Sequence, residues 1–242
     1  TGGAVLLAAE AALRCGAGLV SVATRPAQVP ALLARTPEVM AHGVETRAEL
    51  VVLLKTATAV VAGPGLGTGP WSEQLLDAVL ASDGPRILDA DALNLLAAKE
   101  LSPAGAPTVL TPHPGEAARL LGTDTATIGR DRFAALDALR ARAGAGATVL
   151  LKGAGTLLAG ETGVALCPYG NPGMASGGMG DVLSGVIGAL LAQGLGPEAA
   201  ARLGACLHGA AADLAAADTG APGLVASDLA PRLARLVAWL AS

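Results

Sequence analysis

Residues 170–185 read GNPGMASGGMGDVLSG, and this stretch says most about how the chain of 242 residues folds. Gly177, Gly178 and Gly180 lead into an apolar run, which predicts a glycine-opened helix over residues 176–194. Since glycines have no side chains, the backbone N–H groups at the start of this helix can come close to a ligand. A helix N-terminus favours an anion, phosphate in particular, so we expect an anion-binding site here.

The same stretch lacks the lysine of a Walker A phosphate loop, because Met179 stands where that motif requires it. It offers a carboxylate instead, that of Asp181. One interpretation is that Asp181 only complements the helix dipole. That interpretation leaves the neighbouring glycines unexplained, whereas a carboxylate beside a phosphate is useful if it accepts the proton of an attacking hydroxyl. We therefore interpret Asp181 as a general base.

Strands and helices alternate over the rest of the chain. Strands are predicted within residues 18–24, 58–67, 86–89, 108–111 and 148–160, with a hairpin turn at 160–163. Helices are predicted for residues 4–15, 29–34 and 70–81. Two more helices are predicted directly after the strands that end in LDAD and TVLTPHP. Most of the chain beyond residue 176 is predicted to be helical, except for a loop around Pro222. This alternation predicts an α/β fold with a mostly parallel central sheet, built as one domain over residues 1–242.

Polar or glycine-rich segments follow four of the predicted strands. They are GPGLGTG (63–69), DAD (89–91), TPHPGE (111–116) and KGAGT (152–156). In an open α/β sheet, ligands bind at the carboxyl ends of the strands, so we expect these segments to meet at one edge. Asp89, Asp91 and Asn94 would offer oxygens to the same cleft, although Asp91 could equally cap a helix.

The residue types in these segments leave alternatives open. Lys152 and the Thr156 hydroxyl suit a nucleotide phosphate, but a lone lysine is more often an ordinary solvated residue. His113 lies between two prolines that fix its direction, which suits a ligand contact as well as a structural role. Glu116 either caps its helix or holds a magnesium ion through water. The loop 63–69 does not complete a dinucleotide fingerprint, so it is either a tight turn or a turn that approaches a phosphate.

Composition excludes several classes of protein. Hydrophobic residues make up 52% of the chain and charged residues 15%, which argues against disorder. Aromatic residues are only 2%, so Ala, Val and Leu must fill the core, and stacking platforms for single-stranded nucleic acid are missing. A net charge of −4 gives no basic surface for nucleic acid or anionic lipid, and no apolar run reaches the roughly 18 residues of a membrane span.

Three cysteines, Cys15, Cys167 and Cys206, have no metal-ligand spacing, which suits free thiols in a reducing cytoplasm. His42 and His208 have no special setting, and we interpret both as incidental. The amino end carries charges within its apolar part, so it is not a secretory signal. It also does not begin with Met, so we expect the chain to be a fragment of a longer protein.

Six segments, taken together in chain order, resemble the ADP-dependent NAD(P)H-hydrate dehydratases of the ribokinase-like superfamily. They are TGGAVLLAAEAALRCGAGLV, VAGPGLGTG, LDADALN, TPHPGEAARLLG, VLLKGAGT and GNPGMASGGMGDVLSGVIGALLAQG. The resemblance implies a three-layer α/β/α sandwich. It implies a repair reaction in which the S epimer of hydrated NADH or NADPH loses water while ADP, with Mg²⁺, becomes AMP and phosphate.

The resemblance also implies roles for individual residues. The hydrated-cofactor site would comprise Ala4, Gly67, His113 and Asp181, with Asp181 as the catalytic base. The nucleotide site would comprise Lys152, Gly153, Ala154, Gly155, Thr156, Gly178 and Gly180. A homo-oligomer, such as a homotetramer, is implied as well.

This chain departs from the family pattern at its amino end. Family members usually begin with a strand and a glycine-rich turn ahead of the first helix, whereas this chain starts at the end of that turn. Some members also carry a fused epimerase domain on the amino side. We therefore expect that an amino-terminal strand is missing from this sequence, and that an epimerase domain could have been lost with it.

Two other functions remain open on sequence alone. A ribokinase-like small-molecule kinase that phosphorylates a vitamin-precursor alcohol would share the glycine-rich helix start, although not TPHPGE and GNPGM together. A regulatory module would bind adenine nucleotide without turnover. The incomplete glycine fingerprint disfavours a Rossmann dehydrogenase.

Overall fold

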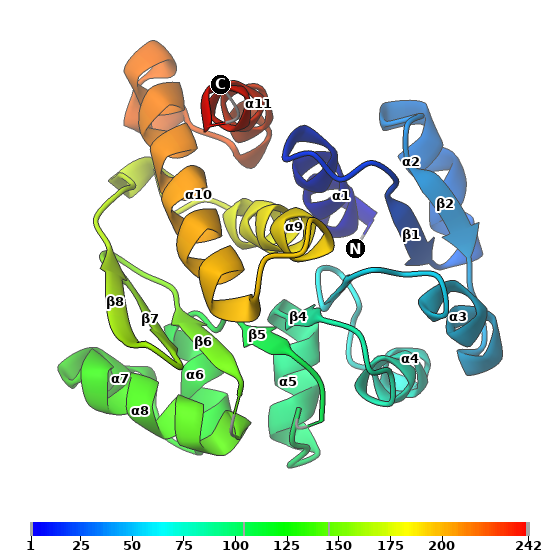
Figure 1. The fold of residues 1–242 in the computed structure, drawn as a ribbon, viewed down its shortest axis with the longest axis horizontal. Helices are drawn as coiled ribbons and strands as arrows, with labels where there is room; N and C mark the ends of the chain where they lie inside the picture. The colour runs from blue at the N-terminus through cyan, green and yellow to red at the C-terminus, as the bar shows by residue number, and fades with distance from the viewer. Residues whose placement is uncertain (1, 104, 145, 241–242) are drawn as a thin grey trace.

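Helices cover both faces of a central sheet in the computed structural model, which describes residues 2–103, 105–144 and 146–240 (Figure 1). The strands are β1 (Ser21–Thr24), β2 (Met40–Gly43), β3 (Val60–Ala62), β4 (Arg86–Leu88), β5 (Thr108–Leu110), β6 (Thr148–Leu151), β7 (Thr156–Gly160) and β8 (Gly163–Cys167). The helices are α1 (Gly2–Arg14), α2 (Val29–Arg35), α3 (Arg47–Leu54), α4 (Pro70–Leu80), α5 (Ala90–Ala98), α6 (Pro114–Leu121), α7 (Thr125–Arg130), α8 (Arg132–Ala143), α9 (Met179–Ala192), α10 (Pro197–Thr219) and α11 (Leu229–Leu240). None of the described helices is both long and apolar enough to cross a membrane.

The main sheet has the strand order β3-β4-β5-β6-β7-β8 in the described residues. Strands β3 to β6 pair in parallel, and β7 and β8 form an antiparallel hairpin at one edge. Strands β1 and β2 pair in parallel in a separate two-stranded sheet. The prediction of an α/β fold with a mostly parallel sheet is confirmed.

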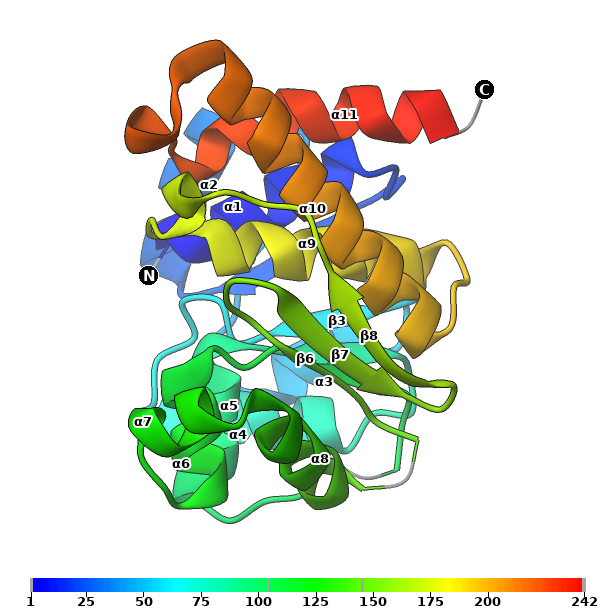
Figure 2. The same ribbon diagram turned by 90° about the vertical axis from the view of Figure 1, so that its left-hand side faces the viewer.

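Side chains of the central strands alternate between two hydrophobic cores, which makes the structure three-layered. Ile87 of β4 and Leu150 of β6 belong to a core shared with α1, α9, α10 and α11. Their neighbours Leu88 and Leu151 belong to a core shared with α4, α5, α6 and α8. Figure 2 shows the first set of helices above the sheet and the second set below it. A strand buried on both faces must be apolar throughout, as these short strands are.

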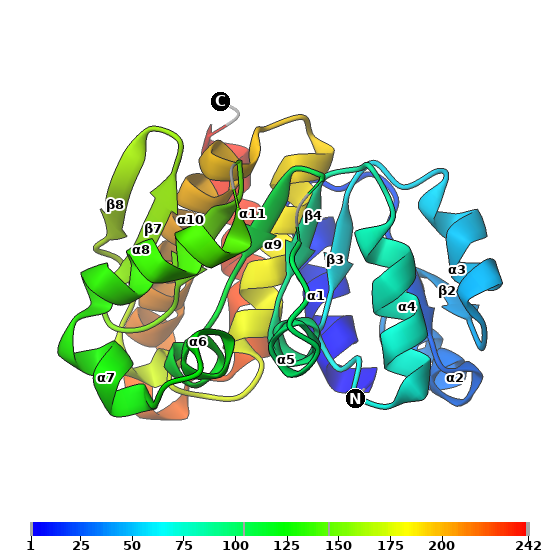
Figure 3. The same cartoon turned by 90° about the horizontal axis from the view of Figure 1, so that it is seen from below.

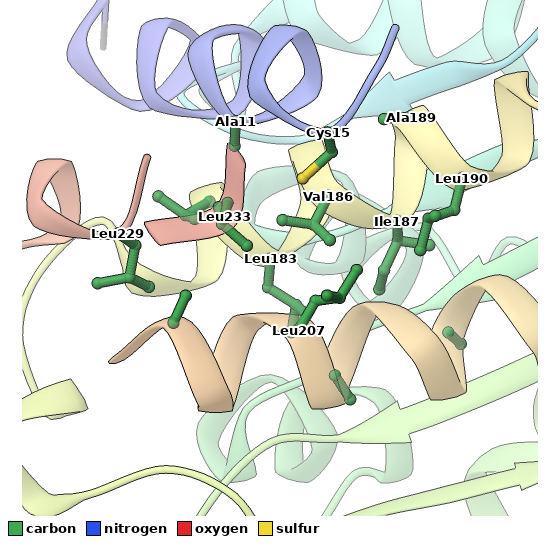
Figure 4. Packing of buried hydrophobic residues seen from close by; sticks show 14 of the residues in the cluster. Ala11, Cys15, Leu183, Val186, Ile187, Ala189, Leu190, Leu207, Leu229 and Leu233 are labelled. Carbon is green, nitrogen blue, oxygen red and sulfur yellow. The ribbon is translucent and has the colours of Figure 1, made fainter. Parts of the chain in front are cut away.

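The upper core contains mostly small and branched side chains, as the low aromatic content requires. Figure 4 shows Ala11 of α1, and Cys15 directly after this helix, next to Leu183 and Val186 of α9. The two helices approach closely at Gly185, where a Cβ atom would lie 2.0 Å from the carbonyl oxygen of Ala8. This close approach fixes α9, and therefore its amino end, relative to α1.

The sequence analysis made no prediction for residues 40–54 and 123–147, where the structure has β2, α3, α7 and α8. The start signals were present. Thr46 accepts a hydrogen bond from Glu49 N and forms a capping box at α3. The carboxylates of Asp124 and Asp131 cap α7 and α8 by accepting from Thr127 N and Ala134 N.

The two sheets are separated by a gap between β1 and β3. Two cavities of about 190 and 160 Å³ lie along it. The first is lined by β1, β3 and side chains of α3 and α4, and the second by β1, β3 and side chains of α1 and α9. Apolar side chains therefore line the gap on both faces of the sheet, from α3 and α4 on one face and from α1 and α9 on the other.

Candidate functional site

The four segments predicted to meet at one edge of the sheet do so. Because β3, β4, β5 and β6 are adjacent and parallel, the loops that follow them leave from the same edge. The amino end of α9 lies at this edge as well. A Cβ atom on Gly180 would lie 3.1 Å from Lys152 Nζ and 3.7 Å from Asp89 Oδ2. Residues from β4, β6 and α9 are thus brought together.

A buried ionic cluster forms the floor of the site. Lys152 Nζ lies 2.6 Å from Asp89 Oδ1 and 3.7 Å from Glu116 Oε2. Ser184 donates a hydrogen bond to Asp89 Oδ2 at 2.8 Å. Burial pulls the pKa of Lys152 down, but the charges of Asp89 and Glu116 outweigh it and raise the pKa, so this lysine is charged. The interpretation of Lys152 as an ordinary solvated lysine is wrong.

The carboxylate of Asp181 lies beside this cluster in the first turn of α9. Burial raises the pKa of Asp181 to about 6, with a further contribution from the negative charge of Asp89 and an opposing one from Lys152. A carboxylate with a pKa near neutrality is well suited to take a proton from an alcohol and to release it again. Asp181 is half-buried, so a substrate can reach it.

Backbone amides at the start of α9 lie beside the ionic cluster, since Gly180 is close to Lys152 and Asp89. The helix begins at Met179, so its first N–H groups have no partners within the helix. Gly178 has a φ of +90°, a left-handed conformation that favours glycine. A Cβ atom there would lie 2.5 Å from Leu7 Cδ1, the flexible end of that side chain.

His113 and Glu116 cap α6 and border the ionic cluster. Glu116 Oε2 accepts from His113 N at 2.8 Å, and His113 Nδ1 accepts from Gly115 N at 2.9 Å. Burial, together with the charge of Lys152, pushes the pKa of His113 below its ordinary value despite the opposing charge of Glu116. The imidazole is therefore neutral near pH 7. Its side chain is half exposed, so it can contact a ligand.

The loop 63–69 reaches the site through Asp91. Gly67 N donates to Asp91 Oδ2 at 2.7 Å, and the charge of Asp91 adds to the rise in the pKa of Asp181. Ala90, between Asp89 and Asp91, has a φ of +46°, a strained conformation for alanine. Ala4 lies near the start of α1, the helix whose Leu7 abuts Gly178. Gly67, His113 and Asp181 thus lie in or beside one cluster, whereas Ala4 is linked to it only through Leu7 of the same helix.

The loop 152–156, assigned to the nucleotide, is held by a residue that the sequence analysis missed. Arg132 donates to the carbonyl oxygens of Gly155 and Leu151 at 3.0 and 3.1 Å, and also to that of Ala154. Thr156 Oγ1 donates to Gly153 O at 3.1 Å, so its hydroxyl closes the loop rather than standing free. The sequence gives Arg132 no recognisable motif. Ser184, by contrast, follows Asp181 by three residues in an otherwise apolar helix, a spacing that could have indicated it.

Two buried hydroxyls near this edge have no hydrogen-bond partner within the described residues. They are Thr111 Oγ1, which follows β5, and Ser176 Oγ, which precedes the glycines of α9. Buried polar groups are almost always paired, so these two hydroxyls are exceptions within the described residues. Among all the residues that the structure describes, no group of three or more His, Cys, Asp or Glu side chains could hold a metal ion.

Comparisons with known proteins connect the chain with one family. A family model described as NAD(P)H-hydrate dehydratase matches residues 1–235. The bifunctional NAD(P)H-hydrate repair enzyme Nnr of Coxiella burnetii is 52% identical over 98% of this chain and 48% of its own length. The ADP-dependent (S)-NAD(P)H-hydrate dehydratase of Neisseria meningitidis is 43% identical over 95% of this chain and 78% of its own length.

The fold agrees equally well with a solved structure. The ADP/ATP-dependent NAD(P)H-hydrate dehydratase of Bacillus subtilis, co-crystallized with ATP/Mg²⁺, has a TM-score of 0.86 and 33% identity, covering 99% of this chain and 85% of that one. The expected three-layer fold is therefore confirmed. This chain spans about half the length of the bifunctional relatives.

Proposed function

Because the chain belongs to the NAD(P)H-hydrate dehydratase family, we propose that it dehydrates the S epimer of hydrated NADH or NADPH while ADP becomes AMP and phosphate. The observation that carries the proposal is the position of Asp181. Its carboxylate, with a pKa raised to about 6, lies in the first turn of a helix whose free amides can hold a phosphoryl group.

The proposed reaction proceeds in two steps. Asp181 takes the proton of the hydroxyl on the hydrated nicotinamide ring, and that oxygen attacks the terminal phosphoryl group of ADP. An O–P bond forms and the bond to AMP breaks. The ring nitrogen lone pair then expels phosphate, a proton leaves the adjacent ring carbon, and the double bond is restored. Hydroxide is a poor leaving group and phosphate a good one, which is why the nucleotide is needed.

The described residues divide the work of binding. Amides around Gly178 and Gly180 would stabilise charge on the transferring phosphoryl group. The loop 152–156, fixed by Arg132, would contact the rest of the nucleotide. His113 and Gly67 would contact the hydrated cofactor, together with Ala4. Lys152 would act mainly by keeping Asp89 and Glu116 neutralised beneath the phosphates.

Magnesium fits this site only together with the nucleotide. The carboxylates of Asp89, Asp91 and Glu116 already accept hydrogen bonds or pair with Lys152, and they form no ready cage. Mg²⁺ is commonly bound by one or two carboxylates plus substrate phosphates, so Glu116 would contribute through water. When bound, the ion would neutralise charge on the phosphates.

Further features rest on the family alone and belong to the same proposal. They are ADP as the preferred nucleotide, assembly as a homotetramer, a cytoplasmic location and one dehydratase domain over residues 1–242. An epimerase domain is the partner we propose on the amino side, since the longer relatives are named bifunctional.

The test is incubation of the protein with hydrated NADPH, Mg²⁺ and either ADP or ATP, following recovery of reduced-cofactor absorbance. We expect recovery with stoichiometric AMP and phosphate in the ADP reaction. Accumulation of a stable phosphorylated alcohol would instead support the kinase, and nucleotide binding without any product would support the regulatory module.

The matched control is Asp181→Asn, which keeps size and loses the base. We expect turnover to fall by about 10³-fold, within the range for loss of a general base, while ADP still binds. Because burial raises the pKa of Asp181 from 3.8 to about 6 in the folded state, its ionisation lowers stability as pH rises between these two values, and at pH 8 that loss is complete. Asp181→Asn should therefore melt no lower than the wild type at pH 8. Full activity in this folded variant would remove the assignment of the base.

A further inference from the structure

Residues 169–178, the segment that leads into α9, are held against α10 by contacts that no proposed reaction step uses. We call them the α9 entry loop. The loop connects β8 with α9 and contains a short 3-10 helix, Pro172–Met174. In Figures 1 and 2 it passes beside α10 before the chain turns into α9. Its backbone sets where the amides of Gly178 and Gly180 point.

Asp213 of α10 makes the central contact. Its Oδ2 accepts from Gly170 N at 2.9 Å, and its Oδ1 accepts from Asn171 Nδ2 at 3.0 Å. Asn171 Oδ1 in turn accepts from Gly173 N at 3.0 Å, which caps the 3-10 helix. Asp213, Asn171 and Gly173 thus form a relay of two hydrogen bonds from α10 to the middle of the loop, and the bond from Gly170 N adds a third contact to Asp213.

Steric contacts hold the same loop on both sides of this relay. A Cβ atom on Gly209 of α10 would lie 2.7 Å from Tyr169 Cβ. A Cβ atom on Gly173 would lie 2.3 Å from the carbonyl oxygen of Ala221, just after α10. There is no space for the loop to shift toward α10. The hydrogen bonds hold it from moving away.

His208 of α10 is buried beside the start of α9. Burial lowers the pKa of His208 to about 4, an effect that the backbone of Met179, the first residue of α9, opposes. In the described residues its Nε2 atom has no hydrogen-bond partner. Asp213 therefore makes the polar contacts that hold the loop to α10.

From these contacts we propose that Asp213, acting through Asn171, is a positioning residue that fixes the α9 entry loop so that the amides at the start of α9 are preorganised for a phosphoryl group. The proposal rests on the proposed function for its ligand, ADP. The relay reaches neither nucleotide nor hydrate, so Asp213 acts only through the backbone. Preorganised donors gain affinity because no ordering is required when the ligand binds.

The relay permits a sharp test by exchange of its two side chains. In Asp213→Asn, the new amide can still accept from Gly170 N, but its NH₂ group faces that of Asn171. In Asn171→Asp, two carboxylates face each other. In the double variant, the amide at 213 donates to the carboxylate at 171, which still accepts from Gly173 N. Every hydrogen bond is then restored, and only the bond between positions 213 and 171 has its donor and acceptor exchanged.

We expect each single variant to weaken ADP binding about tenfold by calorimetry, the loss typical of one charge-assisted hydrogen bond. The double variant should recover to within about threefold of wild type, which is a coupling that a double-mutant cycle detects. In turnover, KM for ADP should rise more than KM for the hydrate. Asp218→Asn is the control, because Asp218 lies on α10 but is exposed and pairs with Arg232.

Hydrogen exchange of the amides of residues 170–181, measured without ligand, separates the two proposals. Faster exchange in the single variants and recovery in the double variant would support the positioning role even if ADP did not bind, in which case only the proposed function fails. Unchanged exchange and ADP affinity in both single variants would overturn the proposal. So would a double variant as impaired as the sum of its single changes.

Discussion

Burial raises the pKa of Asp181 to about 6, within the range where enzymes are usually assayed. We predict that kcat/KM for the hydrate falls about tenfold per pH unit below pH 6 and levels off above it, because only the ionised carboxylate accepts a proton. Burial also pushes the pKa of His113 below its ordinary value, so the imidazole is neutral near pH 7.

The measurement is a pH–rate profile at saturating ADP, with protein stability checked at each pH. In the variant Asp181→Glu the inflection should move, because the longer side chain carries its carboxyl group away from Asp89 and the helix end. An inflection that stays the same in this variant would show that another group is being titrated.

Lys152 gives a second prediction, because its role differs from that of a free phosphate ligand. Replacing it in Lys152→Met leaves the carboxylates of Asp89 and Glu116 buried without a counter-charge. We expect a loss of about 3–5 kcal/mol in the free energy of unfolding, as for a broken buried ion pair. Lys99→Met is the matched control, since the Lys99–Glu73 pair lies at the surface and should contribute little to stability.

Urea unfolding of the two variants provides this comparison, and ADP titration adds to it. If Lys152 were chiefly a point charge for phosphate, Lys152→Met would lose ADP affinity and keep its stability. That pattern would contradict the role assigned here and restore the simpler sequence-based interpretation.

The position of Asp181 could be predicted from sequence because its signals are local: glycines, a helix start and one acidic residue within a few positions. The partner of Lys152 could not. Asp89 lies 63 residues away, and only the parallel pairing of β4, β5 and β6 brings the two together. Asp213 is a similar case, since it meets Asn171 across 42 residues.

The helices and strands likewise include some that local sequence signals predict and some features that depend on distant contacts. Apolar runs and glycine stops located α1, α4 and α9 to within a few residues. Helices α7 and α8 were overlooked because their apolar pattern is weak, and their starts depend on Asp124 and Asp131. Those capping signals are readable from sequence, whereas the break between β1 and β3 is not.

The contact between α1 and α9 gives a prediction about packing. Gly185→Ala would place a Cβ atom 2.0 Å from the backbone oxygen of Ala8, which can move only if the helices separate. We expect a loss of about 3 kcal/mol, as for overpacking in a tight core. Since α9 carries Asp181, turnover should fall as well.

Gly129→Ala in α7 serves as the control for that change. No atom lies within 4 Å of a Cβ built on Gly129, so alanine should stabilise by about 0.5–1 kcal/mol through its helix propensity. Thermal unfolding of both variants makes the comparison. Equal melting temperatures would show that the close approach of α1 and α9 is not a constraint.

The gap between the two sheets gives a prediction about stability. Strands β1 and β3 each have one neighbour in the described residues, and their free edges face the gap. Both line the same cavities, with Val22 and Val61 contributing to each. One more parallel strand, with apolar side chains on both faces, would fill the cavities and join the sheets.

We predict that an apolar strand joined by a glycine-rich turn ahead of α1 raises the thermal stability of this chain. Figure 3 shows the start of α1 at the end of the molecule where β3 leads into α4, which is where a strand parallel to β3 would finish. Burying several apolar side chains at about 1.5–3 kcal/mol each should exceed the cost of ordering the segment. With about 2–4 °C gained per kcal/mol, the melting temperature should rise measurably.

The comparison is between that extension and a Gly/Ser segment of equal length, which can reach the gap but cannot fill it. Amide exchange in β1 and β3 should slow only with the apolar extension, because only a paired strand protects both free edges. Equal melting temperatures and equal exchange for the two extensions would mean that the gap closes without a further strand, and that the two-sheet arrangement is complete as it stands.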